Sequence, residues 1–239
     1  MTEPLYRDDA YATTCDAKVV GVNDRGGIIL DRTVFYPTSG GQAGDRGVLE
    51  VDGIGPIEIA TTVYDEDRKT IVHVPAEPGK LPEPGVAVRC EIDWRTRHAH
   101  MRLHTCLHLL CAVLPYAVTG GSISADGARL DFDIPDADFA TKEEITAKLN
   151  ELIREDHAVT MTWISDEEMA AKPELVRTMS VKPPMGAGRV RLLEIGGGAV
   201  DLQPCGGTHV ATTGEIGTVV VRKIEKKGAR NRRIRIALA

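Results

Sequence analysis

The stretch WRTRHAHMRLHTCLHLLCAVL, residues 94–114, contains neither Gly nor Pro, and Pro115 follows it directly. A long run without these residues favours a helix, and a proline ends one because its ring removes a backbone donor. We therefore predict a helix over 94–114. His104 and His108 lie four residues apart within it, so the two imidazoles share one face of that helix.

A second pair of candidate ligands, Cys205 and His209, stands in CGGTH, about a hundred residues later. Thiolate and imidazole groups are preferred zinc ligands, and two such pairs can complete a tetrahedral site. The two glycines let the backbone turn tightly enough for both side chains to face one point. HTCLH lacks the glutamate of the HExxH motif, which argues against a zinc protease. Four protein ligands give a closed site, and the spacing leaves open whether a bound metal would be structural or catalytic.

The bulk composition is that of a globular protein: 239 residues, 42% hydrophobic, 27% charged, with a formal net charge of −6. This charge argues against a chain that is basic throughout. Five cysteines without regular spacing make a poor disulfide framework and fit a reducing cytosol. The polar N-terminus and the short apolar run at 107–114 predict a cytoplasmic protein without a membrane partner. The oligomeric state stays open, with a monomer as one option.

Residues 1–93 are predicted to form a small β-barrel or sandwich domain. Short β-prone runs alternate there with Gly, Pro, Asn and Asp, which is typical of closely spaced strands and turns. Residues 94–239 are predicted to be α+β, with helices placed on an antiparallel sheet.

Capping boxes mark two further helices in this second part. Thr141 with Glu144 predicts a helix to about residue 157, and Ser165 begins a shorter one. Loops are predicted at 120–121 and 183–184, where Gly and Pro pairs occur. Strands are predicted at 128–134, 159–164, 190–195, 200–203, 218–223 and 232–237.

Cations gather near the C-terminus. Between residues 222 and 235 there are eight Lys or Arg and one acid, Glu225. KKGARNRR is predicted to be a loop between two strands that presents cations to nucleic-acid phosphates, and a merely solvated charged hairpin is the alternative. The candidate contacts are Lys226, Lys227, Arg230, Arg232 and Arg233.

Five motifs in this order resemble the editing region of alanyl-tRNA synthetases. They are FYPTSGGQAGDRG (35–47), HTCLH (104–108), CGGTH (205–209), ATTGEIG (211–217) and KKGARNRRIRI (226–236). The likeness covers essentially the whole chain and is closest in kind to the freestanding alanyl-tRNA editing proteins of the AlaX type. It resembles the longer form, with an N-terminal barrel followed by a zinc-binding editing domain.

The resemblance implies an ATP-independent hydrolase that deacylates tRNA(Ala) mischarged chiefly with serine, and in some members with glycine. It also implies one zinc ion per chain at a catalytic centre made of His104, His108, Cys205 and His209. A second site that binds the serine hydroxyl suits this task, because a synthetase cannot strongly reject a side chain that merely adds a hydroxyl.

The resemblance also implies contacts to the substrate. Thr119 matches a polar position that recognises the serine hydroxyl, with Gly120 and Gly121 beside it. The glycine-rich segment with Gly40, Gly41 and Gln42 is expected to face the editing pocket.

The sequence shows no obvious carboxylate base beside the ligands. Asp131 and Asp133 alternate with apolar residues on a predicted strand, and one face of it could project them into the site, although a solvent-facing edge is the commoner fate. Hydroxyls of the terminal ribose could serve instead.

Two other functions stay open: a zinc-stabilised tRNA-binding module without catalysis, and editing of another mischarged tRNA such as Ser-tRNA(Thr). FYPTSGGQ favours the alanine system.

Overall fold

In a computed structural model, the described residues are 2–135, 139–179 and 188–239. The loop predicted at Pro183 and Pro184 lies outside them. No helix in these three ranges combines the length and the apolar character needed to cross a membrane.

The chain forms two compact units, residues 1–99 and 100–239. Helix α1 (Trp94–Val113) begins in the first unit and continues into the second, and Pro115 follows its end as predicted. The domain boundary that the sequence places between residues 93 and 94 stays a prediction.

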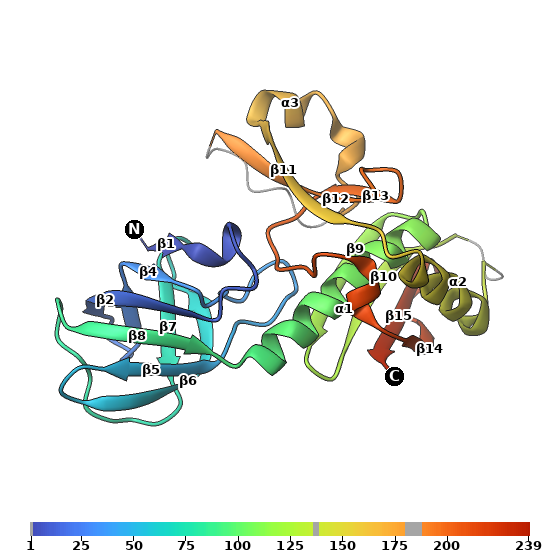
Figure 1. Cartoon of the computed structure of the whole chain (residues 1–239). Helices are drawn as coiled ribbons and strands as arrows, with labels where there is room; N and C mark the ends of the chain where they lie inside the picture. Colours follow the sequence, from blue (N-terminus) through green and yellow to red (C-terminus); the bar gives the residue numbers. More distant parts are fainter. Residues whose placement is uncertain (1, 136–138, 180–187) are drawn as a thin grey trace. The chain divides into compact units, whose positions relative to one another are not determined.

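The first unit contains a closed barrel of six antiparallel strands, which appear in blue to blue-green in Figure 1. Around the barrel the order is β2 (Thr14–Val22), β3 (Ile28–Leu30), β7 (Ile71–Pro75), β6 (Gly55–Tyr64), β5 (Gly47–Val51) and β8 (Ala87–Ile92). Two short strands, β1 (Glu3–Pro4) and β4 (Arg32–Thr33), pair in parallel, and one 3₁₀ turn covers Leu5–Arg7. The predicted barrel is confirmed.

Every second side chain along the strands points inward, and these apolar side chains fill the barrel. Along β8, Val88, Cys90 and Ile92 are buried and their neighbours are exposed, since successive strand residues point to opposite faces. They join Phe35 and Leu49, both fully buried, in one apolar core.

The glycine-rich segment contains a tight turn. Ser39 and Gln42 exchange two backbone hydrogen bonds of 3.1 and 2.8 Å. Between them, Gly40 and Gly41 have φ values of 55° and 85°. A two-residue turn with positive φ at both central positions favours glycine, because other residues are strained there. The glycine pair therefore has a structural reason within its own unit.

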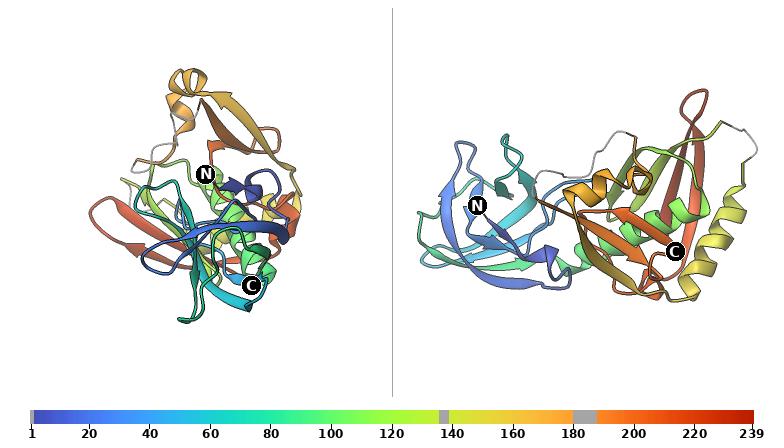
Figure 2. Two further views of the ribbon diagram at one scale, coloured as in Figure 1. Left: turned by 90° about the vertical axis from the view of Figure 1, so that its left-hand side faces the viewer. Right: turned by 90° about the horizontal axis from the view of Figure 1, so that it is seen from above.

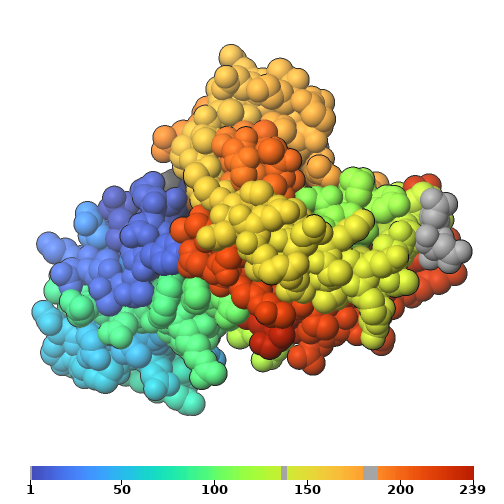
Figure 3. All heavy atoms as spheres, turned by 45° about the vertical axis from the view of Figure 1, so that its right-hand side comes forward, coloured from blue at the N-terminus to red at the C-terminus, as the bar shows by residue number. Residues whose placement is uncertain are grey.

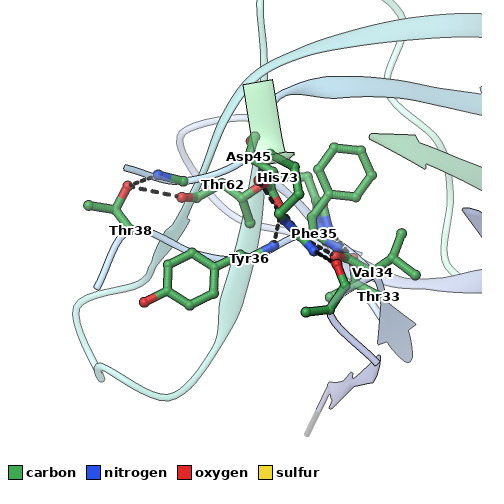
Figure 4. A network of polar contacts seen from close by, with 11 residues as sticks. Thr33, Val34, Phe35, Tyr36, Thr38, Asp45, Thr62 and His73 are labelled. Atoms are coloured by element: carbon green, nitrogen blue, oxygen red, sulfur yellow. Dashed lines mark hydrogen bonds and ion pairs between the residues drawn. The ribbon is translucent and has the colours of Figure 1, made fainter. Parts of the chain in front are cut away.

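A buried ion pair holds the end of this segment. The Asp45 carboxylate accepts a hydrogen bond from the backbone N–H of Tyr36, as Figure 4 shows. It also accepts hydrogen bonds from the Arg97 guanidinium. Arg97 is 0% and Asp45 1% exposed. Thr62 adds a hydroxyl bond of 3.0 Å to the Asp45 carbonyl. A side chain at Gly44 would place its Cβ 1.9 Å from the Thr62 carbonyl oxygen, so only glycine fits there.

His73 is a neutral structural residue in the same barrel. Its Nδ1 lies 3.0 Å from the Ile28 carbonyl, and its Nε2 lies 2.8 Å from the Thr33 hydroxyl. A carbonyl can only accept, so Nδ1 carries the proton and Nε2 accepts from Thr33. Burial lowers the pKa of His73 to about 4.

The second unit contains a four-stranded antiparallel sheet. Its order is β14 (Val219–Lys226), β15 (Asn231–Leu238), β10 (Gly127–Asp133) and β9 (Val118–Ser124). Helix α2 (Lys142–Arg154) packs beside β14, where the Asn150 amide exchanges hydrogen bonds with backbone groups of Val219. Figure 2 shows α2 next to these C-terminal strands. The predicted capping box at Thr141 is present. The helix stops before residue 157, and Asp156 has a positive φ of 51°.

A separate three-stranded antiparallel sheet completes this unit, with order β11 (Val159–Ser165), β12 (Arg189–Ile195) and β13 (Asp201–Pro204). Helix α3 (Asp166–Ala170) covers it, and Met169 packs with Val190 and Leu192. These elements form the yellow-to-orange lobe at the top of Figure 3. The predicted α+β class is confirmed, although the strands expected in one sheet form two.

One predicted loop is wrong. Gly120 and Gly121 lie inside β9, paired with Asp131 and Leu130 of β10. A Cβ on Gly121 would approach the Leu130 side chain to 2.9 Å, so the glycine makes room for tight packing across the strands.

Candidate metal centre

Four side chains from two distant segments converge in the second unit. His104 and His108 lie on α1, and Cys205 and His209 lie in the segment that follows β13. Their ligand atoms all lie within 4.8 Å of one another. The Cys205 sulfur is 3.6 Å from His104 Nε2 and 3.2 Å from His209 Nε2. A tetrahedral zinc ion with bonds of about 2.0–2.3 Å would space neighbouring ligand atoms by about 3.3–3.7 Å.

The three imidazoles form a compact, buried group. Their ring centroids are separated by 4.3 Å for His104 and His209, 5.1 Å for His108 and His209, and 5.5 Å for His104 and His108. Three buried imidazoles beside one sulfur have no apolar packing advantage, whereas they match the donor set of a metal site.

An acidic residue orients His108. Asp201 Oδ2 lies 2.7 Å from His108 Nδ1, and the Gln203 amide donates to both Asp201 oxygens at 2.8 and 3.0 Å. A carboxylate on the outer nitrogen of a ligand histidine fixes its tautomer and directs Nε2 to the metal. Burial opposes protonation of His108, but hydrogen bonds with Asp201 and Cys205 outweigh it and raise its pKa to about 10.

Thr105 supports His209 in the same way. The Thr105 hydroxyl donates to the Met101 carbonyl at 2.9 Å and lies 3.3 Å from His209 Nδ1. Since its proton is used by Met101, it accepts from a protonated Nδ1, which again leaves Nε2 for the ligand cluster. Burial and the neighbouring His104 lower the pKa of His209 to about 3, so its imidazole is neutral.

Arg191 of β12 holds the CGGTH segment in place. Its guanidinium donates to the carbonyls of Cys205 and Gly207, and its own carbonyl accepts from Cys205 N–H. The turn is therefore fixed by a 7% exposed arginine rather than by the glycines alone. Burial opposes ionisation of Cys205, yet His104 and His209 overcome it and lower the pKa of this thiol well below its usual value.

The donor set fits zinc. One thiolate and three imidazoles are borderline ligands of the kind that select zinc, and the outer nitrogens of two of the histidines have partners. The four residues chosen from the sequence as metal ligands are thus brought together, and the group could bind a metal such as zinc.

The residues predicted to recognise the aminoacyl group lie in two places. Thr119, Gly120 and Gly121 lie on β9, where the Thr119 hydroxyl donates to the Asp131 carbonyl at 3.1 Å. Gly40, Gly41 and Gln42 form the turn in the barrel unit. Their roles toward a substrate stay predictions.

The basic hairpin has less unpaired positive charge than a count of its residues suggests. Arg233 forms two hydrogen bonds of 2.8 Å to Asp131, and Arg230 pairs with Asp133. Arg232 is buried and donates to carbonyls of the turn. Within the hairpin, Glu225 pairs with Lys223, Lys227 and Arg235. The count of one acid and eight cations covers only residues 222–235, so it leaves out Asp131 and Asp133 of β10.

Asp131 is consequently a poor candidate base. Burial raises its pKa, but hydrogen bonds from Arg233 and Arg129 outweigh burial and lower it. The carboxylate is 7% exposed and its oxygens are occupied by guanidinium groups.

Sequence reasoning missed the residues that support the ligands: Thr105, Arg191, Asp201 and Gln203. The alternation Asp201, Gln203, Cys205 carries the one usable signal, since residues two apart along a strand share a face. Arg191 and Thr105 gave no such signal, because the groups that they hold in the CGGTH segment are remote in sequence.

Parts of the β-barrel unit and of the α+β unit with the three-histidine, one-cysteine centre match models of aminoacyl-tRNA synthetase domains. The model for the threonyl and alanyl tRNA synthetase second additional domain matches residues 190–235, and the model for class II (A) tRNA synthetases matches residues 11–96.

A relative that matches over its full length shows which family the chain belongs to. The chain is 35% identical over 248 residues to alanyl-tRNA editing protein AlaX-M of Methanosarcina acetivorans, covering 100% of this chain and 99% of that protein. It therefore belongs to the AlaX family of alanyl-tRNA editing proteins.

Two other relatives are longer than this chain. The chain is 35% identical to AlaX-L of Pyrococcus horikoshii, of which it covers 55%, and 34% identical to an alanine–tRNA ligase of Pyrobaculum neutrophilum, of which it covers 25%. The expectation of a longer form is therefore not clearly supported.

Proposed function

We propose that this protein hydrolyses the aminoacyl ester of mischarged tRNA(Ala), chiefly Ser-tRNA(Ala) and secondarily Gly-tRNA(Ala), at a zinc centre. The observation that carries the proposal is the convergence of His104, His108, Cys205 and His209 within 4.8 Å. Family membership supports it, because the relatives that match the whole chain carry the name alanyl-tRNA editing protein.

The residues of the chain prepare the centre for one ion per protein. Asp201 and Thr105 hold two imidazoles in the tautomer that points Nε2 inward, and Arg191 fixes the backbone of the segment that carries Cys205. When bound, zinc supplies Lewis acidity and an anchor that orients an ester or its attacking water.

The proton acceptor for hydrolysis is proposed to come from the substrate. Asp131 and Asp133 of β10 are engaged with arginines, and Asp201 is engaged with His108 and Gln203. A general base needs a free lone pair within hydrogen-bond reach of the water. A hydroxyl of the terminal ribose meets this requirement without a protein carboxylate.

Thr119 is proposed to select serine. Its hydroxyl proton is used by the Asp131 carbonyl, so its oxygen lone pairs can accept a hydrogen bond from a seryl hydroxyl. One buried hydrogen bond contributes about 1–3 kcal/mol, which corresponds to about 5-fold to 150-fold. Glycine and alanine offer no such donor. A contact of Gly40, Gly41 and Gln42 with the substrate stays a prediction from their motif.

The cations that we propose to contact the tRNA backbone differ from the set predicted from the sequence. Lys226 and Arg222 are exposed, and neither has an ion-pair partner within the described residues. Arg222 is the extra residue at a register shift of β14 against β15. Lys227 and Arg230 are also exposed but share their charge with Glu225 and Asp133.

A deacylation assay tests the proposal. The purified protein is given Ser-tRNA(Ala), Gly-tRNA(Ala) and Ser-tRNA(Thr), with and without a zinc chelator, and free amino acid is measured. Cys205→Ala and His209→Ala are expected to abolish release of serine from tRNA(Ala), whereas His157→Ala, outside the centre, keeps it. Full activity of Cys205→Ala would exclude this centre. Tight tRNA binding without any release would instead identify a non-catalytic binding module.

The proposed selectivity for serine is tested by removing the Thr119 hydroxyl. Thr119→Val removes the hydroxyl at nearly constant volume, so kcat/KM for Ser-tRNA(Ala) should fall by about 5-fold to 150-fold. Gly-tRNA(Ala) hydrolysis serves as the internal control and should stay unchanged. Equal losses for both substrates would place Thr119 in the structure of the sheet rather than in recognition.

A further inference from the structure

Two cysteines of the barrel stand directly opposite each other on neighbouring strands. Cys15 of β2 and Cys90 of β8 are antiparallel partners. Backbone hydrogen bonds from Ile92 to Thr13 and from Val19 to Val86 flank them, so alternation makes Cys15 and Cys90 a hydrogen-bonded pair. Such pairs have Cα atoms about 5.5 Å apart, and disulfides join Cα atoms about 4.4–6.8 Å apart. The strands therefore already stand at a distance that a disulfide can bridge.

The two thiols also meet inside the barrel. Cys90 is 0% exposed within the apolar core, and Cys15 is partly exposed and packs against the same core. Because the two residues are direct cross-strand partners, both side chains lie on the same face of the two strands. Interaction with the Cys90 thiol, helped by a backbone hydrogen bond from Val34, lowers the pKa of Cys15, whereas interaction with Cys15 and burial raise the pKa of Cys90. One thiol is thus the better nucleophile and the more accessible, and the other is held against it.

We propose that Cys15 and Cys90 form a peroxide-sensitive dithiol that closes reversibly into a disulfide between β2 and β8. The geometry separates this pair from the other cysteines. Cys106 and Cys111 are buried five residues apart on α1, which does not place them on one helix face, and Cys205 belongs to the metal centre.

The chemistry balances with hydrogen peroxide as the oxidant. The Cys15 thiolate attacks one peroxide oxygen, the O–O bond breaks, and the products are a Cys15 sulfenic acid and hydroxide. The Cys90 sulfur then attacks the Cys15 sulfur, the S–O bond breaks, and hydroxide leaves to become water with the proton of Cys90. Two thiols and one peroxide thus give one disulfide and two waters. A dithiol reductant reverses the reaction by thiol–disulfide exchange.

Peptide mapping of the unmodified protein tests the proposal without any variant. The zinc-loaded protein is treated with hydrogen peroxide, remaining thiols are alkylated, and the digest is analysed by mass spectrometry. A cross-linked peptide pair containing Cys15 and Cys90 is expected, and it should vanish after dithiothreitol. Cys15 recovered as free thiol, or oxidised only to sulfinic acid with Cys90 alkylated, would overturn the proposal.

Variants define the order of the steps. With Cys90→Ala, Cys15 should stop at the sulfenic acid, which a dimedone-type probe captures. With Cys15→Ala, Cys90 should stay reduced, and Cys106→Ala serves as a matched control that keeps the cross-link. If Cys90→Ala fails to fold, the peptide map of the unmodified protein still decides. Oxidation of Cys90 in Cys15→Ala at the rate of the unmodified protein would contradict the assigned order.

Discussion

The carboxylate of Asp201 should strengthen the metal centre although it is not a ligand. Asp201→Asn keeps the shape of the side chain but replaces one acceptor oxygen by an NH₂ group. The group accepts from His108 on one side and from the Gln203 amide on the other, and it is 2% exposed. In the variant, a donor therefore faces either His108 Nδ1 or the Gln203 amide. The Gln203 amide can rotate, so the expected loss is partial.

Loss of such an outer partner typically weakens metal binding 10-fold to 100-fold, which is about 1.4–2.7 kcal/mol. The zinc dissociation constant is measured by competition with a chromogenic chelator, and circular dichroism confirms the fold. Asp126→Asn makes the same chemical change on an exposed turn and should leave zinc affinity unchanged. Zinc affinity of Asp201→Asn within twofold of the unmodified protein would refute the role of this carboxylate.

Three other predictions concern the barrel and the hairpin. The pKa of His73, lowered to about 4, means that the folded state resists a proton that the unfolded state accepts below about pH 6.5. Stability should therefore fall by about 3 kcal/mol between pH 6.5 and 4, and urea titrations of His73→Asn should lack this component of the pH dependence. Arg97→Met should cost about 3–5 kcal/mol because it leaves Asp45 buried and unpaired, and the double variant with Asp45→Asn should recover part of that loss in urea melts. Joint reversal of Arg222 and Lys226 to Glu should weaken tRNA binding and reduce its salt slope by about 1.5, and an unchanged slope would remove these residues from the tRNA surface.

Much of the fold follows from local sequence signals. The absence of Gly and Pro predicts a helix over residues 94–114, and α1 covers Trp94–Val113. The capping boxes at Thr141 and Ser165 occur where the sequence predicts them. The loop predicted at Gly120 and Gly121 is wrong, because glycine serves there for close packing between strands rather than for a turn. Division of the strands into two sheets depends on long-range pairing that no local pattern contains.

The metal centre shows a similar limit. Ligand chemistry and spacing single out His104, His108, Cys205 and His209 as candidate ligands, because zinc binding restricts residue type strongly, and the structure brings the four together. The charge of the hairpin was overestimated, since the aspartates that neutralise Arg230 and Arg233 lie about a hundred residues away on β10. Contacts to remote side chains decide which cations remain for a tRNA.

Zinc-edge X-ray absorption of the purified protein is the sharpest test of how these four side chains are used. One zinc per chain is expected, with three nitrogen neighbours at about 2.0–2.1 Å and one sulfur at about 2.3 Å, and the sulfur signal should disappear in Cys205→Ser. A metal-free protein that is fully active, or a zinc shell without sulfur, would contradict the account.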